Sequence, residues 1–421
     1  MITTKELAPG ITLRCCRDSR FKTGALSFQL VRPMKREEAA KNALLTSVLL
    51  RGTKNHPDLR SITEHLDELY GAAVSTLVRR VGDYQTLGFY CGFMDDRFTL
   101  AGDGVLEPMI RFLEEILLDS PVEEDGFLNA FVESEKKNLI ATMESELNDK
   151  RAYAQGQLLK LLCSADTFGL HRLGEKEDVP GITARELYRH YRQILRESPI
   201  QVFYVGSAEP ETVENLLAPI WQRLERQPVL LPPQSGWQHC EGRDAVETMD
   251  VTQGKLGIGY ITSITNRDPE YPAMQVMNTV FGAGMTSKLF MNVREKLSLC
   301  YSVGSSYYGT KGIVTVFAGI DFDKEELTRQ EIGRQLQACR DGEITQAELI
   351  SAKEALLSSL RATYDSPGAI EGYYSTAALS GMKLSPGEYM AAVEAVTVEQ
   401  VAAAARKMQP HSSYFLKGGS R

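Results

Sequence analysis

The stretch ITARELYRHYRQILRESPIQVFYVG, residues 182–206, decides the fold because its pattern returns near the other end of the chain. It predicts an amphipathic helix, a polar turn, a β-rich strand and a closing Gly206. Residues 396–418, VTVEQVAAAARKMQPHSSYFLKG, repeat that order and close at Gly418. A repeat whose copies are separated by half the chain predicts two similar domains rather than a solenoid of short units.

Two further pairs of segments match upstream of these copies. Long helices are predicted over 131–162 and 347–379, each with an Asp in a break before a second helix. The strand predicted over 84–93 corresponds to one over 312–321, where alternating apolar residues predict one covered and one freer face. Strands followed by long helices in each half predict an α+β class. We expect helices on one face of a largely antiparallel sheet in each domain.

A Pro-rich stretch, RQPVLLPPQSGWQHCEGR at 226–243, separates the two halves. We therefore expect an N-terminal domain over 1–228, a linker over 229–243 and a C-terminal domain over 244–421. A chain of 421 residues is long enough for two such domains.

Composition excludes several classes of protein. A formal net charge of −8 argues against a nucleic-acid binder, which would carry a basic stripe. No apolar run is long enough to span a membrane, and the start MITTKELAPG lacks the features of a signal peptide. The seven cysteines form no C-x-x-C pair, which suits a reducing compartment. We expect a cytoplasmic protein without nucleic-acid or membrane partners.

Motifs for an independently active enzyme are missing. The six histidines form no pair at helical spacing, no Cys has a neighbouring His at a spacing that suggests catalysis, and there is no G-x-S-x-G elbow. His65 with Glu68 could be half of a metal site, although a solvated acidic helix face explains them better. We expect no cofactor and no metal.

The segment FGAGMTSKLFMNVREKLSLCYSVGSS, residues 281–306, carries the strongest functional signal. Gly282 and Gly284 could cradle phosphate at a helix start, but the third glycine of a dinucleotide site and the G-K-[ST] of a P-loop are absent. The simpler interpretation is a tight helix entry capped by Thr286 or Ser287.

Arg294 and Tyr301 follow on this segment. Arg294 lies beside an apolar helix stripe and Tyr301 begins a strand, so the two could hold a peptide carbonyl or carboxylate. The alternative is an Arg at its helix end with a Tyr packed on it. Spacing alone favours this alternative.

The first half resembles the pitrilysin and mitochondrial processing peptidase family, the inverted-motif zinc peptidases. Gly52-Thr53 and the LRSITEHLDELYGA that begins at residue 59 look like the continuation of that family's His-x-x-Glu-His helix. The ligand and base positions of the motif then fall on Ala43, Thr46 and Ser47. None of these side chains replaces a zinc ligand or a general base. The third ligand would fall at Glu133 or Glu135, and one carboxylate cannot hold a catalytic ion alone.

The second half is similar to the family's Gly-rich turn, Ser-x-Leu-Phe and Arg-Glu-Lys-x-x-x-x-Tyr-Ser signature. The resemblance implies that Arg294 and Tyr301 bind the substrate backbone and that two similar domains form half a clamshell. It also implies a non-catalytic subunit, as in bacterial paired peptidases, that positions a peptide or unfolded polypeptide for a zinc-bearing homologous chain. The expected assembly is that heterodimer or self-association. The alternative is a structural scaffold subunit with no role in peptide cleavage.

Overall fold

The structure is a computed structural model that describes residues 2–100 and 102–419. The chain divides into two compact units. The first unit consists of Met1–Glu144, Leu170–Pro233 and Tyr364–Thr376, and the second of Ser145–Gly169, Gln234–Thr363 and Ala377–Arg421. One change of unit, between Pro233 and Gln234, lies inside the expected linker. The other changes had no counterpart in the sequence pattern.

The first unit contains a six-stranded, largely antiparallel sheet. Its order from edge to edge is β1 (Ile2–Ala8), β2 (Ile11–Arg17), β8 (Ile200–Gly206), β3 (Thr23–Pro33), β5 (Tyr84–Met94) and β4 (Ala73–Val81). Only the β2–β8 pair is parallel. A small separate ribbon is formed by β6 (Val122–Glu123) and β7 (Gly126–Phe127).

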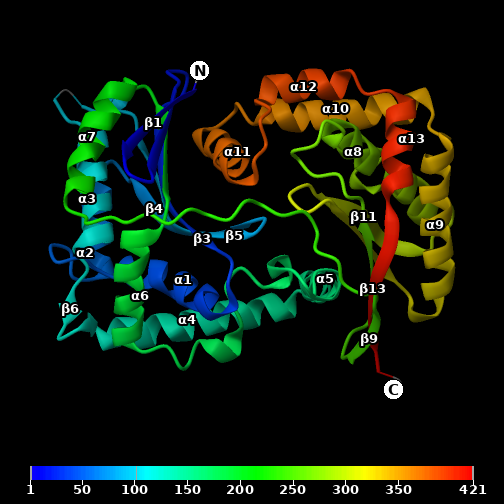
Figure 1. Ribbon diagram of the computed structural model, residues 1–421, viewed down its shortest axis with the longest axis horizontal. Coiled ribbons are helices and arrows are strands. Elements are labelled where there is room, and N and C mark those ends of the chain that lie inside the picture. The colour runs from blue at the N-terminus through cyan, green and yellow to red at the C-terminus, as the bar shows by residue number, and fades with distance from the viewer. Residues whose placement is uncertain (1, 101, 420–421) are drawn as a thin grey trace. The chain divides into compact units, whose positions relative to one another are not determined.

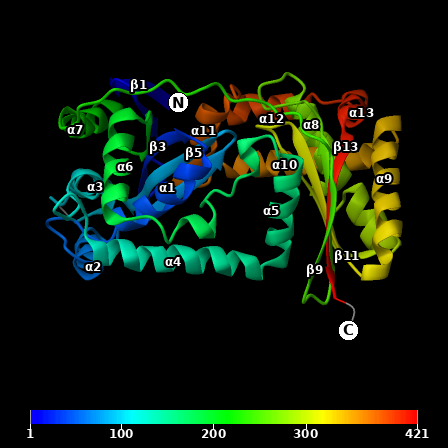
Figure 2. The ribbon, with the colours of Figure 1, turned by 60° about the horizontal axis from the view of Figure 1, so that its bottom comes forward.

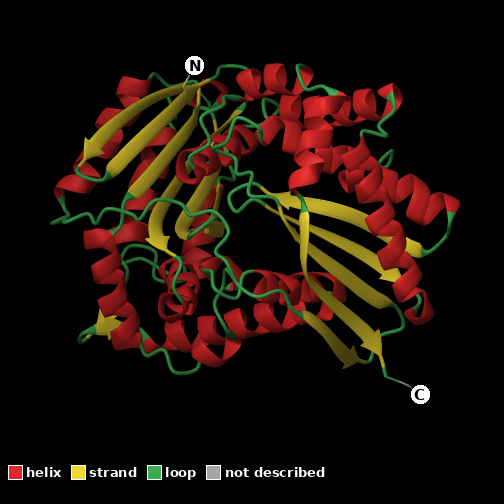
Figure 3. Cartoon of the chain, turned by 45° about the vertical axis from the view of Figure 1, so that its right-hand side comes forward, coloured by secondary structure: helices red, strands yellow, loops and turns green. Residues whose placement is uncertain are grey.

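The second unit repeats this topology. Its five strands run in the order β11 (Cys300–Tyr308), β12 (Ile313–Ile320), β10 (Gly254–Ile261), β13 (Gln409–Gly418) and β9 (Asp244–Met249). Again one pair, β13 with β9, is parallel and the other pairs are antiparallel. Strands β2, β8, β3, β5 and β4 therefore correspond to β9, β13, β10, β12 and β11. The predicted α+β class and the internal repeat are confirmed, and Figure 3 shows each sheet bordered by its own helices.

Helices cover one face of the first sheet. They are α1 (Arg36–Leu49), α2 (Leu59–Glu68), α3 (Leu106–Leu118), α4 (Asn129–Asn148), α6 (Ala184–Glu197) and α7 (Pro210–Gln222). Apolar residues of α1, α3, α6 and α7 form one continuous core with the strands, and Figure 1 shows these helices gathered beside the sheet. Burial of this apolar surface is the main stabilising term for the unit.

The second unit has a corresponding helical layer. It comprises α8 (Tyr271–Asn278), the π-helical segments η4 (Thr279–Ala283) and η5 (Leu289–Lys296), α9 (Glu325–Asp341), α10 (Gln346–Ala362), α12 (Pro386–Glu394) and α13 (Val398–Lys407). The two copies of the repeated helix begin alike. The Thr183 side chain accepts from the amide of Glu186 at the start of α6, and the Thr397 side chain accepts from the amide of Gln400 at the start of α13. Such reciprocal caps satisfy amides that the first helical turn leaves free.

Each sheet also receives a helix on its other face. On the second sheet this helix is α5 (Lys150–Leu162), whose Leu158 packs with Phe317 and Tyr414. Figure 2 shows α5 and α9 on opposite sides of the strands. All residues of β12 are consequently buried, so the expectation of a freer face on this strand is wrong. An added layer of helix, invisible to the alternation of one strand, covers that face.

The matching helix on the first sheet is α11 (Pro367–Ser380), which comes from the second half of the sequence. Its Ile370 packs with Phe203 and Val205. Glu371 is 1% exposed and accepts hydrogen bonds from Ser27 and Gln29, both at 2.8 Å. A buried carboxylate held by hydrogen bonds fixes the register of this helix on the sheet.

The break between α4 and α5 is the one predicted from the sequence. Asp149 is the N-cap of α5, and its carboxylate accepts from the amides of Arg151 and Ala152. Within the described chain, no helix combines the length and apolar character needed to cross a bilayer.

Candidate functional site

Helix α1 carries the positions of the degenerate motif. Ala43 and Thr46 are buried in the core of the first unit, and Ser47 is half-buried. The Thr46 hydroxyl donates to the carbonyl oxygen of Ala43 across 3.0 Å. Ala43 offers no donor atom and Thr46 is bonded to its own helix, so these residues do not fit a zinc ion.

The two carboxylates considered for a third ligand are both paired with cations. Glu133 lies 2.8 Å from the ammonium of Lys136 on the same helix, α4. The largely buried Glu135 lies 3.3 Å from the guanidinium of Arg51, which follows α1. Among the described residues, no three His, Cys, Asp or Glu side chains are grouped so that they could hold a metal ion.

His65 belongs to an aromatic cluster that sequence spacing did not indicate. Its ring lies 4.5 Å from that of His56 and 4.9 Å from that of Phe112. Burial, followed by the neighbouring His56, lowers the pKa of His65. His56 in turn lies 3.1 Å from the carboxylate of Glu115. The two histidines are nine positions apart, His56 in the loop after α1 and His65 on α2, so no helical spacing predicts their contact.

The Gly-rich turn is shaped by close packing. A Cβ on Gly282 would lie 2.7 Å from atoms of Leu289 and of Ser305, whereas a Cβ on Gly284 would have 3.8 Å or more of room. The hydroxyl of Ser287 accepts from the amide of Phe290 across 3.3 Å. Gly282 thus lets η4 approach β11, and Ser287 satisfies a helix-start amide in the way expected of a cap.

The chain turns sharply between Arg294 and Tyr301. The amide of Ser298 donates to the carbonyl of Arg294, and that of Leu299 to the carbonyl of Val293, both across 3.0 Å. Ser298 has φ of +50°, the left-handed region that ends helices and usually requires glycine. This reversal carries the chain from η5 directly into the edge strand β11.

Tyr301 is the extra residue of a β-bulge. Cys300 pairs with Ile320 while Ser302 pairs with Gly319, so Tyr301 has no partner on β12. Bulges re-aim side chains at sheet edges and beside active sites. Tyr301 is 62% exposed, which makes it one of the most exposed large hydrophobic residues of the unit.

Arg294 and Tyr301, the two residues expected to bind substrate, both contact neighbours within their own unit. The guanidinium of Arg294 lies over the Phe290 ring, 4.6 Å from its centre, in a cation–π contact, and its Nε is 3.6 Å from the Glu295 carboxylate. The Tyr301 hydroxyl donates to Oδ1 of Asp321 across 3.1 Å. Asp321 carries no signal in the sequence, because its role depends on the strand pairing that places it beside Tyr301.

Comparison with known proteins decides the family. Residues 181–356 match the family described as Peptidase M16 inactive domain. The protein named Probable inactive metalloprotease YmfF, from Bacillus subtilis (strain 168), is 31% identical over 409 residues, which cover 97% of this chain and 96% of that protein. The chain belongs to the M16 peptidase family.

Two solved structures share the M16 architecture over nearly their whole length. A crystal structure of a conserved protein from Enterococcus faecalis V583 has a TM-score of 0.90 and 27% identity, covering 100% of this chain and 99% of that one. The structure described as peptidase M16 inactive domain from Pseudomonas fluorescens has a TM-score of 0.81 at 20% identity, covering 100% and 98%. The predicted resemblance is confirmed: the chain is a metalloprotease-like M16 protein that lacks the catalytic motif.

Proposed function

We propose that this chain is the substrate-holding, non-catalytic subunit of a zinc-dependent peptidase assembly. Arg294 and Tyr301 bind the backbone of an extended peptide, and a zinc-bearing homologous chain supplies the metal and the general base. The contribution of this chain is positioning, which converts a loose encounter into a geometry from which the partner's chemistry proceeds.

The observation that carries the proposal is the bulge at Tyr301. An exposed aromatic residue at a strand edge has little reason to be there for stability, because burial is what makes aromatic side chains stabilising. Arg294 lies in the last turn of the preceding π-helical segment, and its guanidinium keeps free donor atoms at the surface. Five donors in a planar fork suit a peptide carbonyl or a terminal carboxylate.

The proposed zinc-bearing partner is motivated by the absence of zinc ligands and of a general base on α1. Ala43, Thr46 and Ser47 provide no ligand set, so any peptide bond held by this chain must be cut elsewhere. A homologue that retains His-x-x-Glu-His would offer the missing half.

A scaffold role is the second candidate, and the contacts of the two residues are compatible with it. The Arg294–Phe290 stack and the Tyr301–Asp321 hydrogen bond would also be useful in a chain that never meets a peptide. In that case Arg294 stabilises η5, Tyr301 stabilises the start of β11 against the end of β12, and neither residue binds a peptide.

The experiment is peptidase assay of this chain reconstituted with a zinc-bearing M16 homologue from the same organism. Arg294→Ala removes a charged donor that contributes about 1.5–3 kcal/mol, so activity of the pair should fall roughly tenfold to a hundredfold. Tyr301→Phe should cost less because it deletes one neutral hydroxyl.

Arg334→Ala provides the matched control, because Arg334 is an exposed arginine of the same unit that pairs with Glu331 on α9. It should leave activity unchanged. Thermal melts of all three variants accompany the assay. Unchanged peptidase activity of Arg294→Ala with a lowered melting temperature would favour the scaffold candidate.

A further inference from the structure

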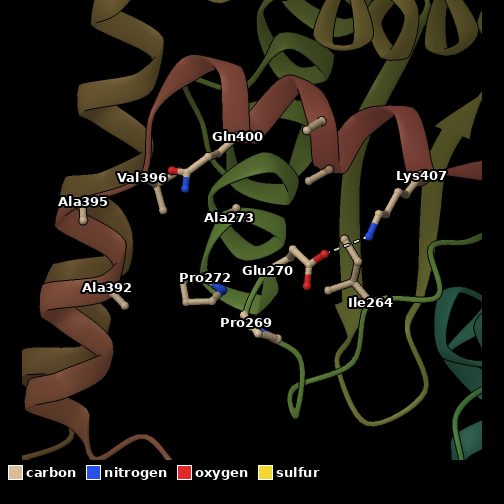
Figure 4. A pocket seen from close by; sticks show the side chains of 12 residues that line it. Ile264, Pro269, Glu270, Pro272, Ala273, Ala392, Ala395, Val396, Gln400 and Lys407 are labelled. Atoms are coloured by element: carbon tan, nitrogen blue, oxygen red, sulfur yellow. Dashed lines mark hydrogen bonds and ion pairs between the residues drawn. The ribbon is translucent and has the colours of Figure 1, made fainter.

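A pocket of about 440 Å³ opens in the second unit, away from η5 and β11 in the sequence and lined by other elements. The start of α8, the turn after α12 and the length of α13 enclose it (Figure 4). Its volume is in the range of small-molecule sites, roughly 300–1,000 Å³.

The inner wall of this pocket is apolar. It is formed by the buried residues Ile264, Pro272, Ala273, Val396 and Ala404. Alanines on both α8 and α13 leave the space that larger side chains would fill. Such a wall accepts a hydrocarbon side chain, and burying apolar surface there is favourable.

One pair of opposite charges lies at the mouth. Glu270, at the start of α8, lies 3.0 Å from the ammonium of Lys407, the last residue of α13 (Figure 4). Both side chains are about half exposed, at 51% and 50%. The hydrogen bond from Lys407 lowers the pKa of Glu270, so the carboxylate is charged at neutral pH. An exposed pair of this kind contributes little to stability and opens easily.

We propose that the pocket binds a free α-amino acid with an apolar side chain, such as leucine. The ligand's carboxylate pairs with Lys407, its ammonium pairs with Glu270, and its side chain enters the apolar wall. This site uses neither Arg294 nor Tyr301. Its test is therefore independent of the test of the proposed function.

The charge arrangement selects this class among amphiphilic ligands. The carboxylate of a fatty acid can pair with Lys407, but it places a second negative charge beside Glu270 and leaves Glu270 without a new partner. The ammonium of an aliphatic amine likewise places a second positive charge beside Lys407 and leaves Lys407 without one. In a peptide the two terminal charges lie on different residues and are too far apart for one pair of side chains 3.0 Å apart. Only a free amino acid carries both charges on a single carbon.

The test is isothermal calorimetry of the 421-residue chain with L-leucine. Isocaproate, which lacks the ammonium, and isoamylamine, which lacks the carboxylate, are the comparison ligands. We expect saturable binding of leucine and at least tenfold weaker binding of each comparison ligand. Glu270→Gln and Lys407→Gln should each weaken leucine binding at least tenfold, while Lys417→Gln, an exposed lysine on β13, should not.

A variant that fills the pocket keeps the test independent of the charges. Ala403 lines the pocket but is exposed on α13, so Ala403→Phe should block the mouth without lowering the melting temperature. Loss of leucine binding in this variant supports the site. Leucine binding unchanged by Ala403→Phe, or equal binding of isocaproate, would overturn the proposal. So would the absence of saturation by leucine, isoleucine and phenylalanine at about 10 mM.

Discussion

The hydroxyl of Tyr301 donates a hydrogen bond to Oδ1 of Asp321, the residue that directly follows β12. Asp321 also forms an ion pair with Lys324 at 3.0 Å. Hydrogen bonds from Lys324 and then from Tyr301 lower the pKa of Asp321, so this carboxylate is charged at neutral pH. Tyr301 is thus oriented by an acceptor just beyond the end of the neighbouring strand, and its single hydroxyl proton is already engaged.

Removal of this acceptor should therefore act through Tyr301. Asp321→Ala should lower the peptidase activity of the reconstituted pair about twofold to tenfold, the effect of losing one ordinary hydrogen bond. In a chain that already carries Tyr301→Phe, the same change should have almost no further effect, as a double-mutant cycle would show. Asp323→Ala, a nearby exposed carboxylate, is the control. Additive losses in the double variant would contradict the relationship.

The chain should bind no stoichiometric zinc. Ala43 has no donor atom, and the Thr46 hydroxyl is bonded to the Ala43 carbonyl. Metal analysis of protein purified without chelator should give far less than one zinc per chain. One equivalent of zinc that is lost in Glu135→Gln or in His65→Ala would contradict this expectation.

Arg51 and Glu135 should depend on each other for stability. Arg51→Ala leaves the largely buried Glu135 without its cation, which should cost about 1–3 kcal/mol of unfolding free energy. Glu135→Gln in the same chain should recover part of that loss, because the unpaired charge is removed. Denaturant unfolding of the single and double variants measures this. Equal stability of Arg51→Ala and the double variant would show that the pairing is not what stabilises this region.

Two neighbouring glycines should respond differently to the same change. Gly282→Ala brings a methyl group within 2.7 Å of Leu289 and Ser305, so we expect a loss of about 1–3 kcal/mol from overpacking. Gly284→Ala has room, and its φ of −125° suits any residue. This variant should be neutral or stabilised by up to about 1 kcal/mol. A comparison of their melting temperatures decides; equal effects would mean that the turn does not depend on the close approach of η4 to β11.

His190 should make the first unit sensitive to acid. Its Nε2 lies 2.7 Å from Oδ1 of the buried Asn42, and burial lowers the pKa of His190 to about 4. In the unfolded chain His190 is protonated below about pH 6.5, whereas in the folded chain it stays neutral down to about pH 4. The contribution of His190 to stability is therefore complete above pH 6.5 and is lost as the pH falls toward 4. Between pH 7.5 and 5 the loss should be about 2 kcal/mol.

The matched variant isolates this contribution from that of the carboxylates. His190→Gln keeps a side-chain donor for Asn42 but cannot be protonated. It should lose less stability than the unchanged chain over the same pH range, as measured by urea unfolding. Identical pH dependence of the two proteins would show that His190 is protonated equally in the folded and unfolded states.

Sequence patterns predicted a large part of the fold because they are local. The period of the apolar residues predicted the helix–strand copies, which are α6–β8 and α13–β13 in the structure, and an Asp between two helical patterns predicted the break at Asp149. One of these local predictions is wrong: β12 was expected to have a freer face, and all its residues are buried. Alternation along one strand cannot reveal a helix that arrives from about 150 residues away in the sequence to cover its second face.

By itself the sequence determined that this chain has two similar halves and no zinc-binding motif, because both follow from residue identity and spacing. The tertiary structure alone decided where each of α5 and α11 packs, that Arg51 neutralises Glu135, and that Tyr301 sits on a bulge facing Asp321. These relationships join residues far apart in the chain or depend on strand register. Register and packing are fixed by burial of the whole unit, which no short stretch of residues encodes.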